Sequence, residues 1–138
     1  MTSAKPENAT LLIVEDHDAM RAMLRAHVQS AHPDYVVLEA ANGAGALATC
    51  RTHRPRLILI DIGLPDIDGI ELGAHLKELV PEAALIVVSQ HSGRVYMERT
   101  RAMGAFAYVT KDRIFQDLLT AIARALGIAP GAGEKAGP

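Results

Sequence analysis

A short run of large aliphatic residues near the middle of the chain ends abruptly at a single carboxylate. Leu57–Ile60 is wholly aliphatic, and Asp61 follows it directly. Such a run, followed by the turn-forming residues Gly63, Pro65 and Gly69, is typical of a β-strand buried on both faces. Because open α/β sheets bind ligands at the carboxyl ends of their strands, Asp61 is the first candidate functional residue.

Other apolar runs, at residues 10–14, 35–40, 84–88 and 106–109, alternate with segments whose apolar residues recur every three or four positions. The pattern predicts five strands alternating with five helices, which implies parallel strands, right-handed crossovers and helices on both faces. We therefore expect one doubly wound α/β domain over residues 10–127. Residues 1–9 are expected to be disordered, and residues 128–138 to form a flexible tail or a truncated linker.

The helices differ in the quality of their apolar stripes. The helix expected from about residue 93 to 103 has the poorest stripe, because Arg94, Arg99 and Arg101 crowd its few apolar positions. A helix that buries little docks loosely, so we expect this one to be the most easily displaced. Asp16 or Asp18 is expected to cap the first helix, and Asp112 the last.

Composition excludes several functional classes. With 138 residues, 49% of them hydrophobic, the chain suits one globular domain. A net charge of −2 argues against an unaided nucleic-acid binder. The lone Cys50 allows no internal disulfide and is expected to pack as a small apolar group. The polar start is no signal peptide, and no apolar run approaches the ~20 residues that span a bilayer. We expect a cytoplasmic protein without membrane or direct nucleic-acid contacts.

Parallel strands bring their carboxyl ends to one edge of the sheet, which gathers Glu15, Asp16, Asp61, Ser89 and Lys111. Three carboxylates in one cleft repel one another unless a cation joins them, and their hard oxygens suit Mg²⁺. An ionised Asp61 can act as a nucleophile toward a phosphoryl group, with Lys111 and the metal neutralising the charge on the transferring oxygens. Ser89 can donate to a phosphoryl oxygen, and that movement would be a switch.

These residues resemble the receiver domain of two-component response regulators, a flavodoxin-like fold with sheet order 2-1-3-4-5. The match spans residues 10–126, and its motif residues most resemble those of receivers of the LuxR-type, DNA-binding branch. Four motifs carry it in order, with spacing near that of the family: Ile13–Asp16, Leu59–Gly69, Val87–Ser89 and Gly104–Lys111.

The resemblance implies that Asp61 accepts a phosphoryl group from a histidine kinase or phosphotransfer protein. It also implies that Asp16 and Asp61 bind Mg²⁺ directly, with the backbone carbonyl of Gly63 as a third ligand, and that Glu15 acts directly or through water. The protein would then be a regulatory phosphoacceptor rather than an enzyme.

Further roles follow from the same resemblance. Ser89 would be the switch hydroxyl, Lys111 the phosphate and carboxylate partner, and Tyr108 an aromatic that turns inward on activation. Gly63, Gln90 and His91 lie where such domains tune dephosphorylation. The donor is expected to dock on the first helix near the cleft and on the loop after Lys111; the docking residues on that helix would be Met20, Met23, Leu24 and His27.

Alternatives remain open at this stage. A pseudo-receiver that never takes phosphate has Gln90 as its only support, and Tyr108 can be read as a plain edge-strand aromatic. A Mg²⁺-dependent aspartyl-phosphate phosphatase would need a second acid close after Asp61, and residues 62–64 offer none. Output would pass through a downstream protein partner, a homodimer or a phosphorelay, or through a DNA-binding domain beyond Pro138.

Overall fold

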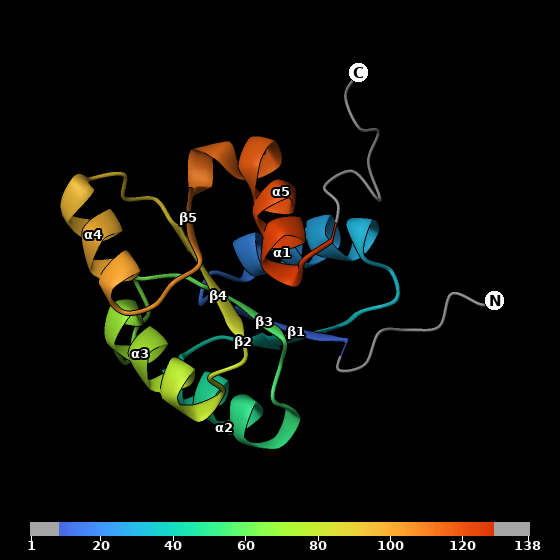
Figure 1. Cartoon of the computed structure of the whole chain (residues 1–138), viewed down its shortest axis with the longest axis horizontal. Coiled ribbons are helices and arrows are strands. Elements are labelled where there is room, and N and C mark those ends of the chain that lie inside the picture. Colours follow the sequence, from blue (N-terminus) through green and yellow to red (C-terminus); the bar gives the residue numbers. More distant parts are fainter. Residues whose placement is uncertain (1–8, 129–138) are drawn as a thin grey trace.

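The computed structural model describes residues 9–128. Figure 1 shows a central sheet between two layers of helices. In chain order the elements are β1 (Thr10–Val14), α1 (Asp18–Ala31), β2 (Val36–Ala40), α2 (Gly43–His53), β3 (Leu57–Ile60), α3 (Gly69–Leu79), β4 (Ala84–Ser89), α4 (Arg94–Ala102), β5 (Ala107–Thr110), the short 3-10 helix η1 (Lys111–Arg113) and α5 (Ile114–Leu126).

The sheet has the strand order β2-β1-β3-β4-β5, and every neighbouring pair is parallel. Helices α1 and α5 cover one face, while α2, α3 and α4 cover the other (Figure 1). The predicted doubly wound α/β fold is confirmed. Its topology places the carboxyl ends of β1, β3, β4 and β5 along one edge of the sheet.

Strand β3 is the centre of both cores. Leu57 and Leu59 pack with the cluster under α1 and α5, whereas Ile58 and Ile60 pack with the cluster under α2 and α3. All four side chains are buried, and each contributes about 1.5–3 kcal/mol relative to an exposed position. This two-sided burial is why the strand is a continuous aliphatic run, and it fixes the point at which Asp61 leaves the sheet.

Two predicted helix caps are wrong. The N-cap of α1 is His17, whose side chain accepts a hydrogen bond from the Met20 N–H at 3.3 Å, so neither Asp16 nor Asp18 caps that helix. Asp112 lies inside η1, and α5 begins at Ile114 without a side-chain cap. Directly after β5 the chain makes a tight 3-10 turn, and this turn begins at Lys111.

The predicted terminal segments 1–9 and 128–138 fall mostly outside the described residues. Of the first segment only Ala9 is described; it is buried, and its carbonyl accepts a hydrogen bond from Val36 at 2.8 Å. Cys50 is buried in α2, and this burial raises the pKa of its thiol to about 11. Among the described helices, none is long and apolar enough to cross a membrane.

Gly69 lies against the backbone of the loop after β3. A Cβ at Gly69 would lie 2.5 Å from the Asp61 carbonyl oxygen and 2.5 Å from Ile62 Cα, both backbone atoms that cannot yield without moving the loop. We expect Gly69→Ala to lower the free energy of unfolding by about 1–3 kcal/mol, as overpacking does. Urea unfolding measures this.

Gly63→Ala is the matched control, since a Cβ there meets nothing within 4 Å. It should leave the unfolding midpoint nearly unchanged. Equal stability of the two variants would show that the loop adapts freely and does not fix Asp61.

Candidate functional site

Three carboxylates meet at the carboxyl edge of the sheet. Glu15 and Asp16 directly follow β1, and Asp61 directly follows β3. Each offers a carboxylate oxygen that lies within 4.8 Å of the others. They open on a hollow of about 350 Å³, whose remaining lining residues are His17, Met20, Gly63, Gln90, His91 and Lys111.

Lys111 joins two of these acids. Its Nζ lies 3.0 Å from Glu15 Oε1 and 3.4 Å from Asp61 Oδ2, reaching from the first residue after β5 to the first residues after β1 and β3. Glu15 is only 1% exposed. The site therefore holds three carboxylates and one ammonium, an excess of negative charge where the strands end.

The pKa directions reflect this arrangement. Burial raises the pKa of Glu15, and the neighbouring Asp61 raises it further, while Lys111 partly offsets both. Burial opposes the charge on Lys111, but Glu15 and Asp61 outweigh it and raise the pKa of Lys111 above its usual value. A divalent cation would relieve the repulsion among the acids, and their hard oxygens fit Mg²⁺.

Backbone and side-chain contacts orient Asp61. Its N–H donates to the Val14 carbonyl at 3.0 Å, which ties it to β1. Its Oδ1 accepts from the Gly63 N–H at 3.2 Å, and its Oδ2 faces Lys111. Gly63 lies at the hollow, as expected of a tuning or ligand position, and the role predicted for its carbonyl stays a prediction.

Ser89 and Tyr108 meet at His91. Ser89 is buried at the end of β4, and its Oγ accepts from the His91 N–H at 3.0 Å. Tyr108 of β5 donates its hydroxyl to the His91 carbonyl at 2.5 Å. The His91 ring stacks on Tyr96 of α4, with centroids 4.4 Å apart. The loop after β4 thus connects the acidic hollow, where Gln90 also lies, to α4 and β5.

The predicted docking residues on α1 do not form one surface. Met20, Met23 and His27 are half-buried, but Leu24 is 1% exposed and packs in the core, so it cannot contact a donor; that prediction is wrong. Sequence reasoning missed Phe115, which is 69% exposed on α5 and meets the His27 ring edge-on at 4.9 Å. The sequence feature that could have identified Phe115 is an aromatic residue that lies outside the apolar stripe of the last helix.

Comparisons with known proteins agree with this geometry. The family model for the response regulator receiver domain matches residues 11–123. The nitrate/nitrite response regulator NarL of Escherichia coli is 33% identical over 121 residues, which are 86% of this chain and 55% of NarL. The chain spans about half the length of the curated relatives it matches.

Solved structures give the same picture. A LuxR-family response regulator from Aurantimonas superimposes with a TM-score of 0.78 at 29% identity, covering 86% of each chain. A CheY-like receiver domain protein from Methanospirillum hungatei gives a TM-score of 0.75 at 31% identity, covering 86% of this chain and 93% of that one.

Glu15→Gln tests the electrostatics of the site. Because the pKa of Glu15 is raised above 4.5, the folded state holds more protons than the unfolded state between 4.5 and the raised value, and its stability falls as pH rises through that window. We expect Glu15→Gln to stabilise the metal-free protein at pH 7 by about 1 kcal/mol, as relief of functional-site strain commonly does. The gain should vanish below pH 4.5.

Urea unfolding across this pH range measures the effect, in buffer containing a chelator. Glu78→Gln, which removes an exposed carboxylate of α3, is the control and should leave the stability at pH 7 nearly unchanged. A destabilised Glu15→Gln at pH 7 would mean that the Lys111 ion pair outweighs the burial of the carboxylate.

Proposed function

This chain belongs to the response regulator receiver domain family, and we propose that it is a phosphorylation-activated switch whose phosphoacceptor is Asp61. The observation that carries the proposal is the arrangement of Asp61 beside Glu15, Asp16 and Lys111 at one edge of the sheet. The donor would be a histidine kinase or phosphotransfer protein, and the setting would be the cytoplasm. The protein would act as a regulatory phosphoacceptor, with no activity on other substrates.

In the proposed reaction a carboxylate oxygen of Asp61 forms the new bond to phosphorus as the bond to the donor breaks. Lys111, within 3.4 Å of Asp61 Oδ2, would compensate the charge on the phosphoryl oxygens. Glu15, Asp16 and Asp61 would hold Mg²⁺, which supplies positive charge to the transferring group. The Gly63 N–H would keep the carboxylate oriented.

The switch would run through His91. A phosphoryl group on Asp61 would draw the Ser89 hydroxyl toward it. The Ser89 Oγ already accepts a hydrogen bond from the His91 N–H. Movement of that backbone would disturb the Tyr108 hydrogen bond to the His91 carbonyl and the stacking of His91 on Tyr96. Each contact links the phosphorylation site to α4 or β5, so the signal would appear on their surface.

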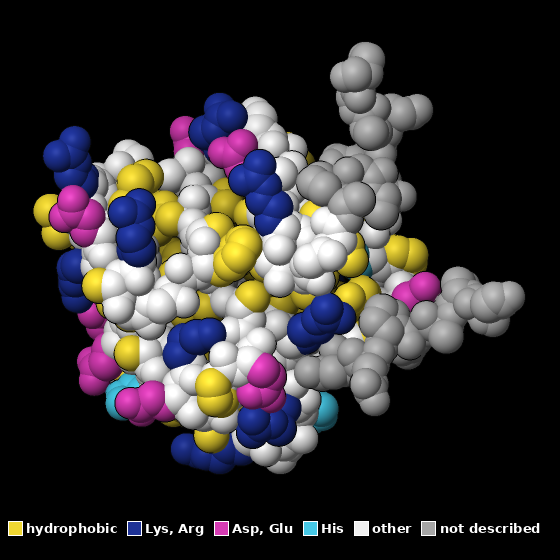
Figure 2. Space-filling model, viewed as in Figure 1, with side chains coloured by type: hydrophobic (Ala, Val, Ile, Leu, Met, Phe, Trp, Pro, Cys, Tyr) yellow, Lys and Arg dark blue, Asp and Glu magenta, His cyan; other side chains and the backbone are white. Residues whose placement is uncertain are grey.

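The proposed output surface is formed by α4, β5 and α5. Within α4, all of which the structure describes, only Thr100 is buried. Val95, Met97 and Phe106 are exposed there, and Figure 2 shows hydrophobic side chains among basic ones on this side of the molecule. Displacement of α4 would change the affinity of this surface for a downstream protein partner or for a second copy of the chain.

Intact-mass measurement after incubation with acetyl phosphate and Mg²⁺ tests the proposal. We expect one added phosphoryl group on the wild-type protein, dependent on Mg²⁺ and absent from Asp61→Asn. Asp34→Asn, at an exposed turn between α1 and β2 that does not line the hollow, is the matched control and should be modified like the wild type.

No modification of the wild-type protein by acetyl phosphate or by a phosphorylated histidine donor would leave the pseudo-receiver alternative. Release of phosphate from phosphomonoesters over many turnovers would instead support a phosphatase.

A further inference from the structure

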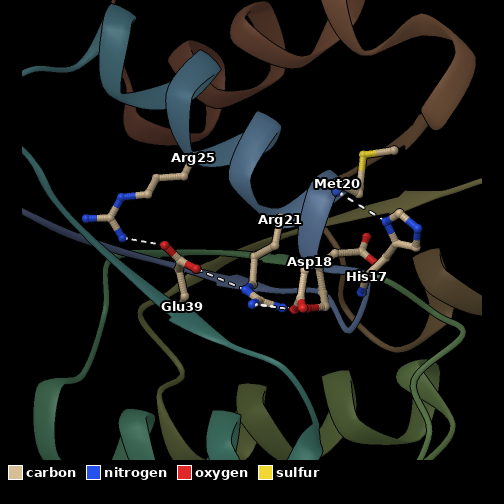
Figure 3. Close-up of polar contacts among 7 residues, drawn as sticks. His17, Asp18, Met20, Arg21, Arg25 and Glu39 are labelled. Atoms are coloured by element: carbon tan, nitrogen blue, oxygen red, sulfur yellow. Dashed lines mark hydrogen bonds and ion pairs between the residues drawn. The ribbon is translucent and has the colours of Figure 1, made fainter.

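The side chain of Arg21 on α1 connects its own helix to the Glu15 backbone and to β2. Its Nη1 donates to the Glu15 backbone carbonyl at 2.8 Å, its Nε to Glu39 Oε1 of β2 at 2.9 Å, and its Nη2 to Asp18 Oδ1 at 2.8 Å. Figure 3 shows Glu39 between Arg21 and Arg25, and Arg21 reaching Asp18. The guanidinium fork of Arg21 is suited to this task because its donors are fixed in one plane.

The contact with Glu15 bears directly on the metal-binding acids. The Glu15 carbonyl lies in the peptide plane that joins Glu15 to Asp16. The other backbone group of Glu15, its N–H, donates to the Ala40 carbonyl of β2 at 3.0 Å. With Arg21 on the carbonyl and β2 on the N–H, the backbone of Glu15 is held on both sides, which fixes the directions in which the two acidic side chains leave it.

Charge is balanced around Arg21. Arg25 Nη1 lies 2.6 Å from Glu39 Oε2, so two arginines face Glu39 and Asp18. Arg25 and then Arg21 hold the pKa of Glu39 below its ordinary value, which keeps that carboxylate ionised. The group can therefore fix the loop without adding net positive charge that would repel a divalent cation.

We propose that Arg21 is a positioning residue for the Mg²⁺ site: by holding the Glu15 carbonyl, it preorganises Glu15 and Asp16 for the metal. The inference rests on the proposed function, because it assigns Arg21 a role in binding the ion which that function requires. Residues that orient metal ligands typically change metal affinity about 10–100-fold when they are replaced.

The experiment compares Arg21→Met with Arg25→Met by calorimetric titration of the unphosphorylated full chain with Mg²⁺ alone. Both variants lose one positive charge and one ion pair to Glu39. Arg21→Met in addition loses the Glu15 carbonyl contact and the exposed ion pair to Asp18. We expect Arg21→Met to bind Mg²⁺ about tenfold more weakly or worse. Arg25→Met should bind as tightly as the wild type, or slightly tighter because a nearby positive charge is gone.

A second readout separates positioning from a merely structural role. With acetyl phosphate as donor, the Mg²⁺ concentration for half-maximal modification of Arg21→Met should rise by the same factor as its dissociation constant, while the maximal rate at saturating Mg²⁺ is retained. Arg21→Lys keeps the charge and one donor and should restore part of the affinity. If Arg21→Met does not fold, Arg21→Lys and Glu39→Gln carry the test, and both should weaken Mg²⁺ binding.

The failures are distinguishable. If the variants that fold bind Mg²⁺ as Arg25→Met does, the positioning role is overturned while the proposed function stands. If the wild-type protein itself neither binds Mg²⁺ nor takes a phosphoryl group, the proposed function fails, and the role of Arg21 fails with it.

Discussion

Repulsion among three carboxylates at one edge of a sheet is the constraint that the surrounding structure has to satisfy. Glu15, Asp16 and Asp61 present oxygens within 4.8 Å of one another, and Glu15 is almost wholly buried. Such an arrangement destabilises a fold unless other groups hold it. Lys111 supplies one positive charge from the end of β5, and the aliphatic core on both sides of β3 supplies the rigid support. Stability elsewhere in the domain maintains an electrostatically strained site.

The groups around the hollow divide into those held by the packed sheet and those held by side-chain hydrogen bonds. Asp61 is tied to β1 through its backbone, and the start of α3 packs directly on its carbonyl at Gly69. The loop after β4 is held mainly by polar contacts of His91 with Ser89 and Tyr108. A rigid acidic side and a hydrogen-bonded loop facing it are the two parts that a ligand-driven switch requires.

Most of the architecture could be predicted from local patterns. The alternation of strands with helices was sufficient for a parallel sheet covered on both faces, and this alone gathers Glu15, Asp61, Ser89 and Lys111. The strand order came from the resemblance to receiver domains. The local pattern could not say which apolar residues of α1 are buried, because the apolar face of a helix contains both fully buried and partly exposed positions. Leu24 was therefore assigned to a surface although it belongs to the core.

Interactions between distant segments were also beyond the sequence. Arg21 and Glu39 lie 18 positions apart, and their contact depends on how α1 sits over β2. Tyr108 and His91 are 17 positions apart and meet only because β4 and β5 are neighbours in a defined register. The 3-10 turn at Lys111 depends on how the chain leaves β5, which a capping rule based on Asp112 alone did not capture.

Because only one side chain of α4 is buried, little free energy is needed to shift this helix. Besides Thr100, α4 is held by partly buried Tyr96 and by an exposed ion pair between Arg99 and Asp68. A coupling free energy of about 1–3 kcal/mol, the range of one or two charge-assisted hydrogen bonds, changes a two-state equilibrium by roughly 5–150-fold. Under the proposed function, phosphorylation at the strand ends would therefore need to supply only a coupling free energy of this size to change the population of α4 conformations.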